Sequence, residues 1–264
     1  MTNIVPISRN RHASKRWKRD KGYSFASKDT AAPLVLAELP RATRLLPVCF
    51  IAQGEDFVPA AVLGLGSSQN LLVAPHGAWL GPYVPAVYRS YPFVLGAAGE
   101  DRSVLCIDED SGLVTDGPEG ELFFDEKGEP SKPIADIMAF LQQLSANRKA
   151  TQLVCANLKE HGLFVPMPLN VKSPSGDKRV DGLYRIDEAA FNALPDEAFL
   201  KVRAAGGLPV VYCHLLSMQL LPALGELADA RADAAARRLP VNEAGELDLE
   251  FMNDGPMLDF SRLK

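Results

Sequence analysis

The chain has 264 residues, of which 47% are hydrophobic and 23% are charged, and it carries a net charge of −5. This composition is typical of a folded protein with one or two domains, and it excludes a disordered or fibrous body. The charge is unevenly distributed, because residues 1–28 carry a net +7 whereas residues 29–264 carry a net −12.

Residues 1–28 form a basic N-terminal arm in which cations surround an aromatic residue. Its densest part is the run Arg16, Trp17, Lys18 and Arg19. Cations of this kind neutralise phosphates and aromatic rings stack on bases, so one interpretation is binding to RNA, DNA or an anionic membrane. The negative body repels polyanions, and we therefore favour an arm that lies across the protein's own acidic surface.

The part of the chain that follows the arm has the pattern of short strands. Apolar runs at residues 46–52 and 58–65 predict two strands joined by a turn. Shorter strands are expected at residues 71–74, 93–95, 103–107 and 122–124. Turns rich in glycine and acidic residues separate them, and the close spacing predicts a β-rich region up to Pro130.

The pattern changes to helical spacing after Pro130. Ser131 and Pro133 are placed to start a helix over residues 134–144, and a second helix over residues 151–161 ends at Gly162. The elements expected after it are a hairpin with its turn at residues 175–177, short helices that start at Asp187 and Pro195, a buried helix over residues 208–221 and an alanine-rich helix over residues 224–238.

These elements predict a single α+β domain over residues 29–238. A largely antiparallel, curved β-sheet from the first half is expected to pack against the helices of the second half. Residues 239–264 form an acidic C-terminal tail with weak patterning.

No motif for catalysis or metal binding occurs in the sequence. The acidic triplet at residues 108–110 is followed at once by a Ser-Gly pair, which indicates a solvated turn after a strand. The histidines form no His-Glu-x-x-His pair; they are His12, His76, His161 and His214. We therefore predict no metal site and no cofactor, and we assign no catalytic residue.

The four cysteines are isolated, and each lies within an apolar run: Cys49, Cys106, Cys155 and Cys213. Cysteines of this kind pack as small core residues, and a long chain without a disulfide framework is typical of a reducing compartment. The N-terminus lacks the apolar region of a secretory signal, and no run reaches the ~18 apolar residues that cross a bilayer. We expect a cytoplasmic protein without a transmembrane segment.

A segment rich in aromatic residues and prolines is the best candidate for a partner surface. It spans residues 81–93, and its candidate contact residues are Tyr83, Tyr88, Arg89, Tyr91 and Phe93. Exposed aromatic and arginine side chains are enriched where proteins bind one another. Ordinary packing of a loop is the alternative interpretation of the same residues.

Several blocks occur in an order that resembles the bacterial SapC family. They include PLVLAELPRATRLLPVCF, AAVLGLGSSQNLLV, GPYVPAVYRSYPFVL, DRSVLCIDEDSGLV and LYRIDEAAFNALPDEAFLKVRAAGGLPVVYCHLLSM. The resemblance covers residues 5–220 and depends on the order of many blocks. It implies an intracellular accessory role in a Gram-negative bacterium, linked to surface-layer export or outer-membrane uptake. The family supplies no established reaction and no catalytic residues to transfer.

Three functional hypotheses follow. The leading one is a non-enzymatic accessory or adaptor protein that binds a protein or peptide partner. The second is an enzyme with an active site assembled from distant residues, such as the acids at 108–110 with His76 or His214. The third is binding of nucleic acid through the basic arm.

Overall fold

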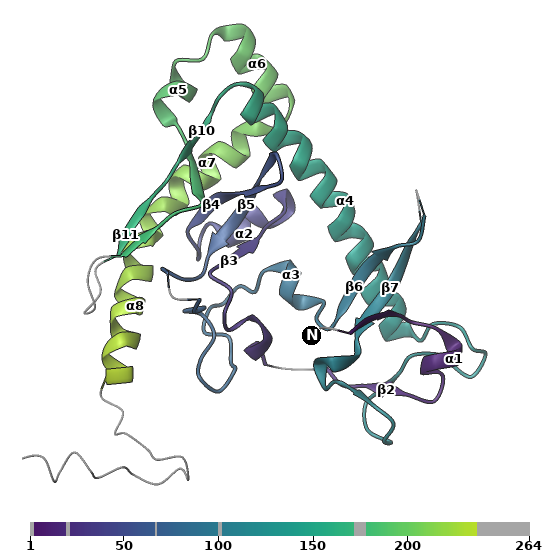
Figure 1. Cartoon of the computed structure of the whole chain (residues 1–264). Helices are drawn as coiled ribbons and strands as arrows, with labels where there is room; N and C mark the ends of the chain where they lie inside the picture. The colour runs from purple at the N-terminus through teal and green to yellow at the C-terminus, as the bar shows by residue number, and fades with distance from the viewer. Residues whose placement is uncertain (1–2, 20–21, 67, 100–101, 172–177, 237–264) are drawn as a thin grey trace, which may run out of the picture.

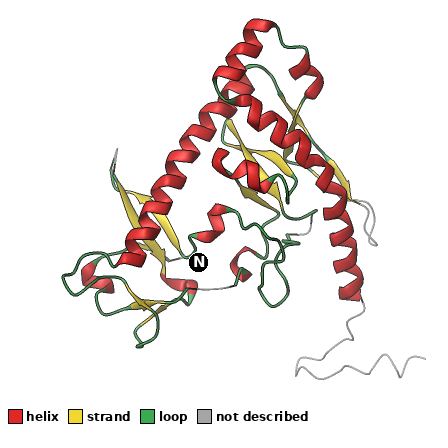
Figure 2. Ribbon diagram, turned by 180° about the vertical axis from the view of Figure 1, so that it is seen from behind, coloured by secondary structure: helices red, strands yellow, loops and turns green. Residues whose placement is uncertain are grey.

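The computed structural model describes residues 3–19, 22–66, 68–99, 102–171 and 178–236, and it confirms the predicted α+β class (Figure 1). The strands form separate antiparallel sheets that do not close. One long helix, α4 (Lys132–Glu160), runs diagonally across the molecule. Seen from behind in Figure 2, strands lie beside both ends of this helix.

The largest sheet has five antiparallel strands in the order β10–β13–β4–β5–β3. Their bounds are Phe164–Pro166, Leu183–Ile186, Val48–Gln53, Asp56–Val62 and Ala31–Pro33. The predicted strands at residues 46–52 and 58–65 become β4 and β5, which pair from Val48–Ala61 to Gln53–Asp56. Gly54 closes their turn with a φ of 65°, a conformation that glycine adopts without strain.

Two three-stranded sheets lie toward the N-terminal end of α4, and each contains a strand of the basic arm. Their orders are β1–β7–β6 and β8–β2–β9. The bounds are Ile4–Pro6, Ser103–Asp108 and Phe93–Ala97 for the first, and Val114–Thr115, Arg16–Trp17 and Glu121–Leu122 for the second. The pair β11 (Leu169–Val171) and β12 (Lys178–Val180) extends the hairpin formed by β10 and β13.

The remaining helices are short except near the C-terminus. The α-helices are α1 (Arg9–His12), α2 (Leu39–Ala42), α3 (Ala86–Arg89), α5 (Glu188–Asn192), α6 (Asp196–Ala204), α7 (Gly207–Ser217) and α8 (Leu221–Ala236). The 3₁₀ turns are η1 (Ser24–Ala26), η2 (Leu36–Glu38), η3 (Glu109–Ser111) and η4 (Met218–Leu220). Asp187 caps α5 as predicted, since its side chain accepts a hydrogen bond from the Ala190 amide at 3.1 Å.

Helix α4 merges the two helices that the sequence predicts into one. The stretch of residues 145–150 between them contains neither glycine nor proline, so nothing in it interrupts the backbone hydrogen bonds. At 29 residues the helix is roughly 43 Å long. It ends where predicted, because Gly162 adopts a φ of 67° directly after His161.

This length allows α4 to contribute to two hydrophobic cores. Near its C-terminus, Val154 and Leu158 pack with Phe50 and Ile186 in the core of the five-stranded sheet. Near its N-terminus, Ile134, Leu141 and Leu144 pack in a second core, whose other members include Trp17, Phe93, Ile107 and Phe123. The middle of α4 therefore lies at the junction of the two cores.

Helix α7 is attached to the five-stranded sheet by a buried histidine. The antiparallel register of β4 and β13 places Leu183 opposite Ile51 and Tyr184 opposite Phe50. Two residues further along this register, Val48 of β4 and Ile186 of β13 are separated by the His214 imidazole. Its Nδ1 atom is 2.7 Å from the Val48 carbonyl oxygen, and its Nε2 atom accepts a hydrogen bond from the Ile186 amide at 3.2 Å. Because a carbonyl can only accept, the Nδ1 atom carries the proton.

Besides the merged helices, further predicted elements differ from the structure. The strand predicted at residues 122–124 is the two-residue strand β9 at Glu121–Leu122. Residues 71–74 form turns with one isolated bridge between Val73 and Trp79 instead of a strand. The cause is Asn70, whose buried side chain accepts from the Leu72 amide and donates to the Ala26 carbonyl. The helix predicted as buried over residues 208–221 becomes α7 and η4, and only one of its faces is buried. The turn predicted at residues 175–177 lies outside the described residues.

Candidate functional site

A groove lies beside the middle of α4, at the junction of the two cores. Its volume is about 440 Å³, and its walls come from η2 and α2, from residues 83–89 and from α4. We call it the arginine groove; its lining residues are Val35, Ala37, Glu38, Arg41, Tyr83, Ala86, Arg89, Phe140, Gln143, Leu144 and Asn147. Polar groups from three separate segments therefore converge on one concave surface, as in many binding sites.

A buried carboxylate holds two walls of the groove together. Glu38 is 5% exposed and accepts hydrogen bonds from the Val35 amide at 3.0 Å, the Ala86 amide at 2.7 Å and the Tyr83 hydroxyl at 2.6 Å. These bonds join η2 to the start of α3. Because three donors satisfy the carboxylate, Glu38 acts as an anchor for the groove.

The Tyr83 hydroxyl is held in its protonated form. Burial raises its pKa, and the adjacent Glu38 carboxylate raises it further, because it accepts a hydrogen bond from the neutral phenol and its negative charge opposes ionisation. The hydroxyl is thus a fixed hydrogen-bond donor at neutral pH. It lacks the lowered pKa of a general base.

Two arginines supply the positive charge of the groove. The Arg89 guanidinium carbon lies 5.3 Å from the centre of the Phe140 ring and 5.9 Å from that of the Tyr83 ring. It also lies 3.9 Å from Glu38, which is at the limit of an ion pair. Arg41 is exposed and forms no ion pair with any acid in the described chain. Guanidinium groups on a surface with aromatic faces are suited to binding carboxylates.

A small cavity of about 80 Å³ extends the groove along α4. It shares Val35 and Leu144 with the groove, and Arg148 and Thr151 line its far part. The α4 residues that face this combined surface follow helical spacing: Phe140, Gln143, Leu144, Asn147, Arg148 and Thr151. Thr151 fixes the position of α4, since its hydroxyl accepts from the Leu36 amide at 3.0 Å.

The structure divides the predicted partner-binding residues into two groups. Tyr83 and Arg89 line the arginine groove. Tyr88 and Phe93 are only 7% and 1% exposed, so the expectation that they form a recognition surface is wrong. Tyr88 donates to Asp29 at 2.9 Å, and Phe93 packs edge-on against Trp17. Tyr91 is half-buried and stacks on Phe25 with 3.8 Å between ring centres.

The basic arm lies across acidic surface, as the favoured interpretation predicts. Its ion pairs are Arg9–Glu129, Arg11–Glu109, Lys18–Glu119, Arg19–Glu121 and the longer pair Lys15–Glu109 at 3.9 Å. Arg16 donates to the Gly120 carbonyl at 3.0 Å. Trp17 is buried in the second core and is not available for stacking on a base. The arm's described cations are therefore largely engaged within the fold.

The acids at residues 108–110 do not meet the histidines that the enzyme hypothesis combined with them. Asp108 accepts from the Asn3 and Asp110 amides, which is a structural role. Glu109 pairs with Arg11, and its carboxylate lies 3.3 Å from the imidazole of buried His12. Burial lowers the pKa of His12, and Arg11 lowers the pKa of Glu109. Within the described residues, no group of three or more His, Cys, Asp or Glu side chains is placed to hold a metal ion.

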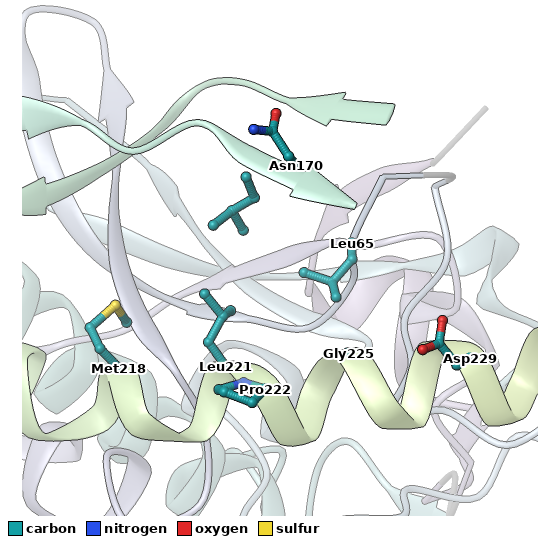
Figure 3. A pocket seen from close by; sticks show the side chains of 8 residues that line it. Leu65, Asn170, Met218, Leu221, Pro222, Gly225 and Asp229 are labelled. Carbon is teal, nitrogen blue, oxygen red and sulfur yellow. The ribbon is translucent and has the colours of Figure 1, made fainter. Parts of the chain in front are cut away.

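A second groove of about 440 Å³ lies between α8 and β11, and it is mainly apolar. Figure 3 shows Leu65 and Leu221 facing its interior, with Asn170 on the strand and Asp229 further along the helix. The helical stretch Gly207–Ala234 that forms one wall is long and apolar enough, by these two criteria, to cross a membrane. On its outer face Tyr212 and Leu216 are 51% and 63% exposed. The groove between α8 and β11 was not expected from the sequence.

Sequence reasoning missed most of the arginine groove. Glu38 carried one usable signal, since it is a lone acid within the apolar run LVLAELP, where a charge requires partners. Phe140, Gln143 and Asn147 share one helical face, but that face also carries the core residue Leu144. Arg41 had no local signal, because only the tertiary structure brings it close to Tyr83.

The model of the SapC family matches residues 7–224. No curated protein and no solved structure matches the chain.

Proposed function

Because this chain belongs to the SapC family, we propose that it is a non-enzymatic accessory protein that binds a protein or peptide partner in the arginine groove. The proposal includes a cytoplasmic location and a link to surface-protein export or outer-membrane uptake. The expected location rests on the four isolated cysteines, which are typical of a reducing compartment, together with the family resemblance. The link to export or uptake rests on the family resemblance alone.

The observation that carries this proposal is the chemistry of the groove lining. Arg41, Arg89 and Gln143 are exposed, and the apolar faces of Phe140 and Ala86 lie among them. Arginine and aromatic residues of this kind supply much of the binding energy in protein interfaces. The one carboxylate in the lining, Glu38, is already saturated with donors.

An enzymatic role has weaker support from the same residues. The Tyr83 hydroxyl remains protonated, and the described groove contains no histidine, cysteine or serine that would serve as a base or nucleophile. Binding of nucleic acid through the arm is also weakly supported, because five of the arm's lysine and arginine side chains already pair with glutamates.

Site-specific photo-crosslinking in cells of the source organism tests the proposal. A photoreactive phenylalanine analogue replaces Gln143, which is exposed in the groove, and in a matched control it replaces Ala146, which is exposed on α4 outside the groove. We expect one discrete protein adduct at position 143 and none at position 146, with mass spectrometry identifying the partner. Equal adducts at both positions, or none at either, would contradict the proposal.

A further inference from the structure

We propose that the arginine groove, together with the small cavity that extends it along α4, binds an acidic stretch of the partner through Arg41 and Arg89 of the groove and Arg148 of the cavity. This inference rests on the proposed function, since it names the chemistry of the partner that the same groove binds. It comes from the charge and shape of the groove alone.

The arginines of this surface differ from the cations of the arm in their ion pairing. Residues 29–264 carry a net −12, and in the arm Arg9, Arg11, Lys18 and Arg19 each lie beside a glutamate. Arg41 and Arg148 nevertheless form no ion pair with any acid that the structure describes. Unpaired guanidinium groups in an acidic protein are available to an external anion.

The one carboxylate in the groove lining, that of Glu38, does not bind the Arg89 guanidinium by a hydrogen bond. Glu38 is 3.9 Å from Arg89, but its oxygens face two backbone amides and the Tyr83 hydroxyl. Arg89 makes no hydrogen bond with Glu38 at this distance. Its guanidinium is instead held over the rings of Tyr83 and Phe140, which fixes its position and leaves its N–H donors free to meet a carboxylate.

The length of the α4 wall matches a short extended peptide. The α4 wall from Phe140 to Arg148 rises by roughly 12 Å. An extended peptide of about four residues spans this distance. Leu144 and the Phe140 ring provide apolar contact between the cations, and Gln143 offers an amide to a peptide backbone. The groove is therefore suited to a short extended segment in which acidic residues alternate with apolar ones.

The experiment measures binding of a fluorescent hexapeptide, Glu-Leu-Glu-Phe-Glu-Glu, to the full-length protein by fluorescence anisotropy. The matched probe has glutamine in place of each glutamate. We expect the acidic probe to bind more tightly than the glutamine probe, and its affinity to fall as salt rises because the attraction is electrostatic. Arg41→Gln, Arg89→Gln and Arg148→Gln are each expected to lower affinity roughly five- to tenfold, the range of an exposed to partly desolvated charged hydrogen bond.

Two control variants remove the same charge outside the groove. Arg44 and Lys149 are exposed and close in sequence to Arg41 and Arg148, but neither lines the groove or the adjoining cavity. Arg44→Gln and Lys149→Gln are expected to bind the acidic probe like the parent protein. An equal loss in these controls would show a general charge effect and overturn the inference.

The remaining outcomes are also decisive. Equal binding of the two probes, or no binding of the acidic probe at millimolar concentration, overturns the inference. So does tighter, arginine-dependent binding of phosphatidylglycerol vesicles or single-stranded DNA, because the ligand would then be a phosphate. If crosslinking at position 143 captures a partner whose binding is unchanged in Arg41→Gln and Arg89→Gln, the proposed function stands and only this inference fails.

Discussion

At the scale of single residues, His214 replaces a hydrogen bond of the β-sheet. The register of β4 and β13 would bring Ile186 opposite Val48, where the amide of one strand normally bonds the carbonyl of the other. The imidazole accepts from that amide and donates to that carbonyl, and so it joins α7 to both strands. Ser217, one turn further along α7, accepts from the Val48 amide at 3.0 Å and strengthens the same junction.

This geometry predicts a stability that depends on pH. Burial lowers the pKa of His214, and the charge of Arg185 lowers it further, although the bond to Val48 acts in the opposite direction. The unfolded chain takes up a proton near pH 6.5, whereas the folded chain resists it because Nε2 must accept from Ile186. The stabilisation is therefore complete above about pH 6.5 and is lost as the pH falls through the folded pKa. Urea unfolding at pH 7.5 and pH 5.0 measures it.

The variant His214→Leu isolates this contribution. It leaves the Val48 carbonyl and the Ile186 amide without partners, and we expect it to lower the free energy of unfolding at pH 7.5 by about 2–4 kcal/mol. The variant should also lose less stability on acidification than the parent, while His76→Leu, at an exposed position, should change neither quantity much. The same pH dependence in His214→Leu and in the parent would contradict the assignment.

At the scale of elements, α4 connects the two cores as one continuous helix. Its first turns pack beside Phe93 and Ile107, and its last turns pack beside Phe50 and Ile186. The arginine groove occupies the middle, so its α4 wall is rigid only if the helix is unbroken there. The chain offers a reporter for each core, since Trp17 lies in the second core and Trp79 packs against the first.

Breaking α4 at its centre is expected to uncouple the cores. Ala146→Pro removes a backbone N–H and clashes with the preceding turn, at a cost of about 3 kcal/mol or more. We predict coincident urea unfolding in the single-tryptophan parents Trp17→Phe and Trp79→Phe, and separate transitions once Ala146→Pro is added to each. Ala146→Gly, which costs only about 1 kcal/mol, should keep the transitions together. Coincident transitions in the proline variant would show that α4 does not couple the cores.

At the scale of the whole molecule, folding brings the two oppositely charged parts of the chain together. The arm is held by ion pairs on the surface and by Trp17 in the interior, where strand β2 lies between β8 and β9. Exposed ion pairs are weakened by water and salt, whereas removal of a buried aromatic side chain leaves a cavity. The buried residue is thus expected to contribute more to the attachment than the charges do.

Two substitutions separate these contributions. Trp17→Ala is expected to lower the free energy of unfolding by about 3–5 kcal/mol, because its ring packs against Phe93 in the second core. Lys18→Gln, which removes only the exposed pair with Glu119, should cause a much smaller loss that shrinks further at high salt. Chemical denaturation of both variants at low and high salt makes the comparison. A larger loss for Lys18→Gln would mean that charge, and not packing, holds the arm.

The sequence by itself determined the features that depend on neighbouring residues. The α+β class, the β4–β5 hairpin, the cap at Asp187 and the end of α4 at Gly162 all follow from local pattern, because backbone propensity and burial periodicity act within a few residues. The family follows from the order of many such blocks along residues 7–224. For the arginine groove, the sequence indicated only Tyr83 and Arg89, because both lie in the segment rich in aromatic residues and prolines.

Only the tertiary structure decided the pairing of distant segments. The arm strand lies between β8 and β9, the His214 imidazole bonds Val48, and Arg41 lines the same groove as Phe140. Each case brings together residues about a hundred or more positions apart. Such contacts form when the free energy gained by burying the whole chain compensates for the entropy lost on closing long loops. The pattern of neighbouring residues does not indicate which distant segments achieve this. The same burial placed Tyr88 and Phe93 in the interior and left Arg89, the neighbour of Tyr88, exposed.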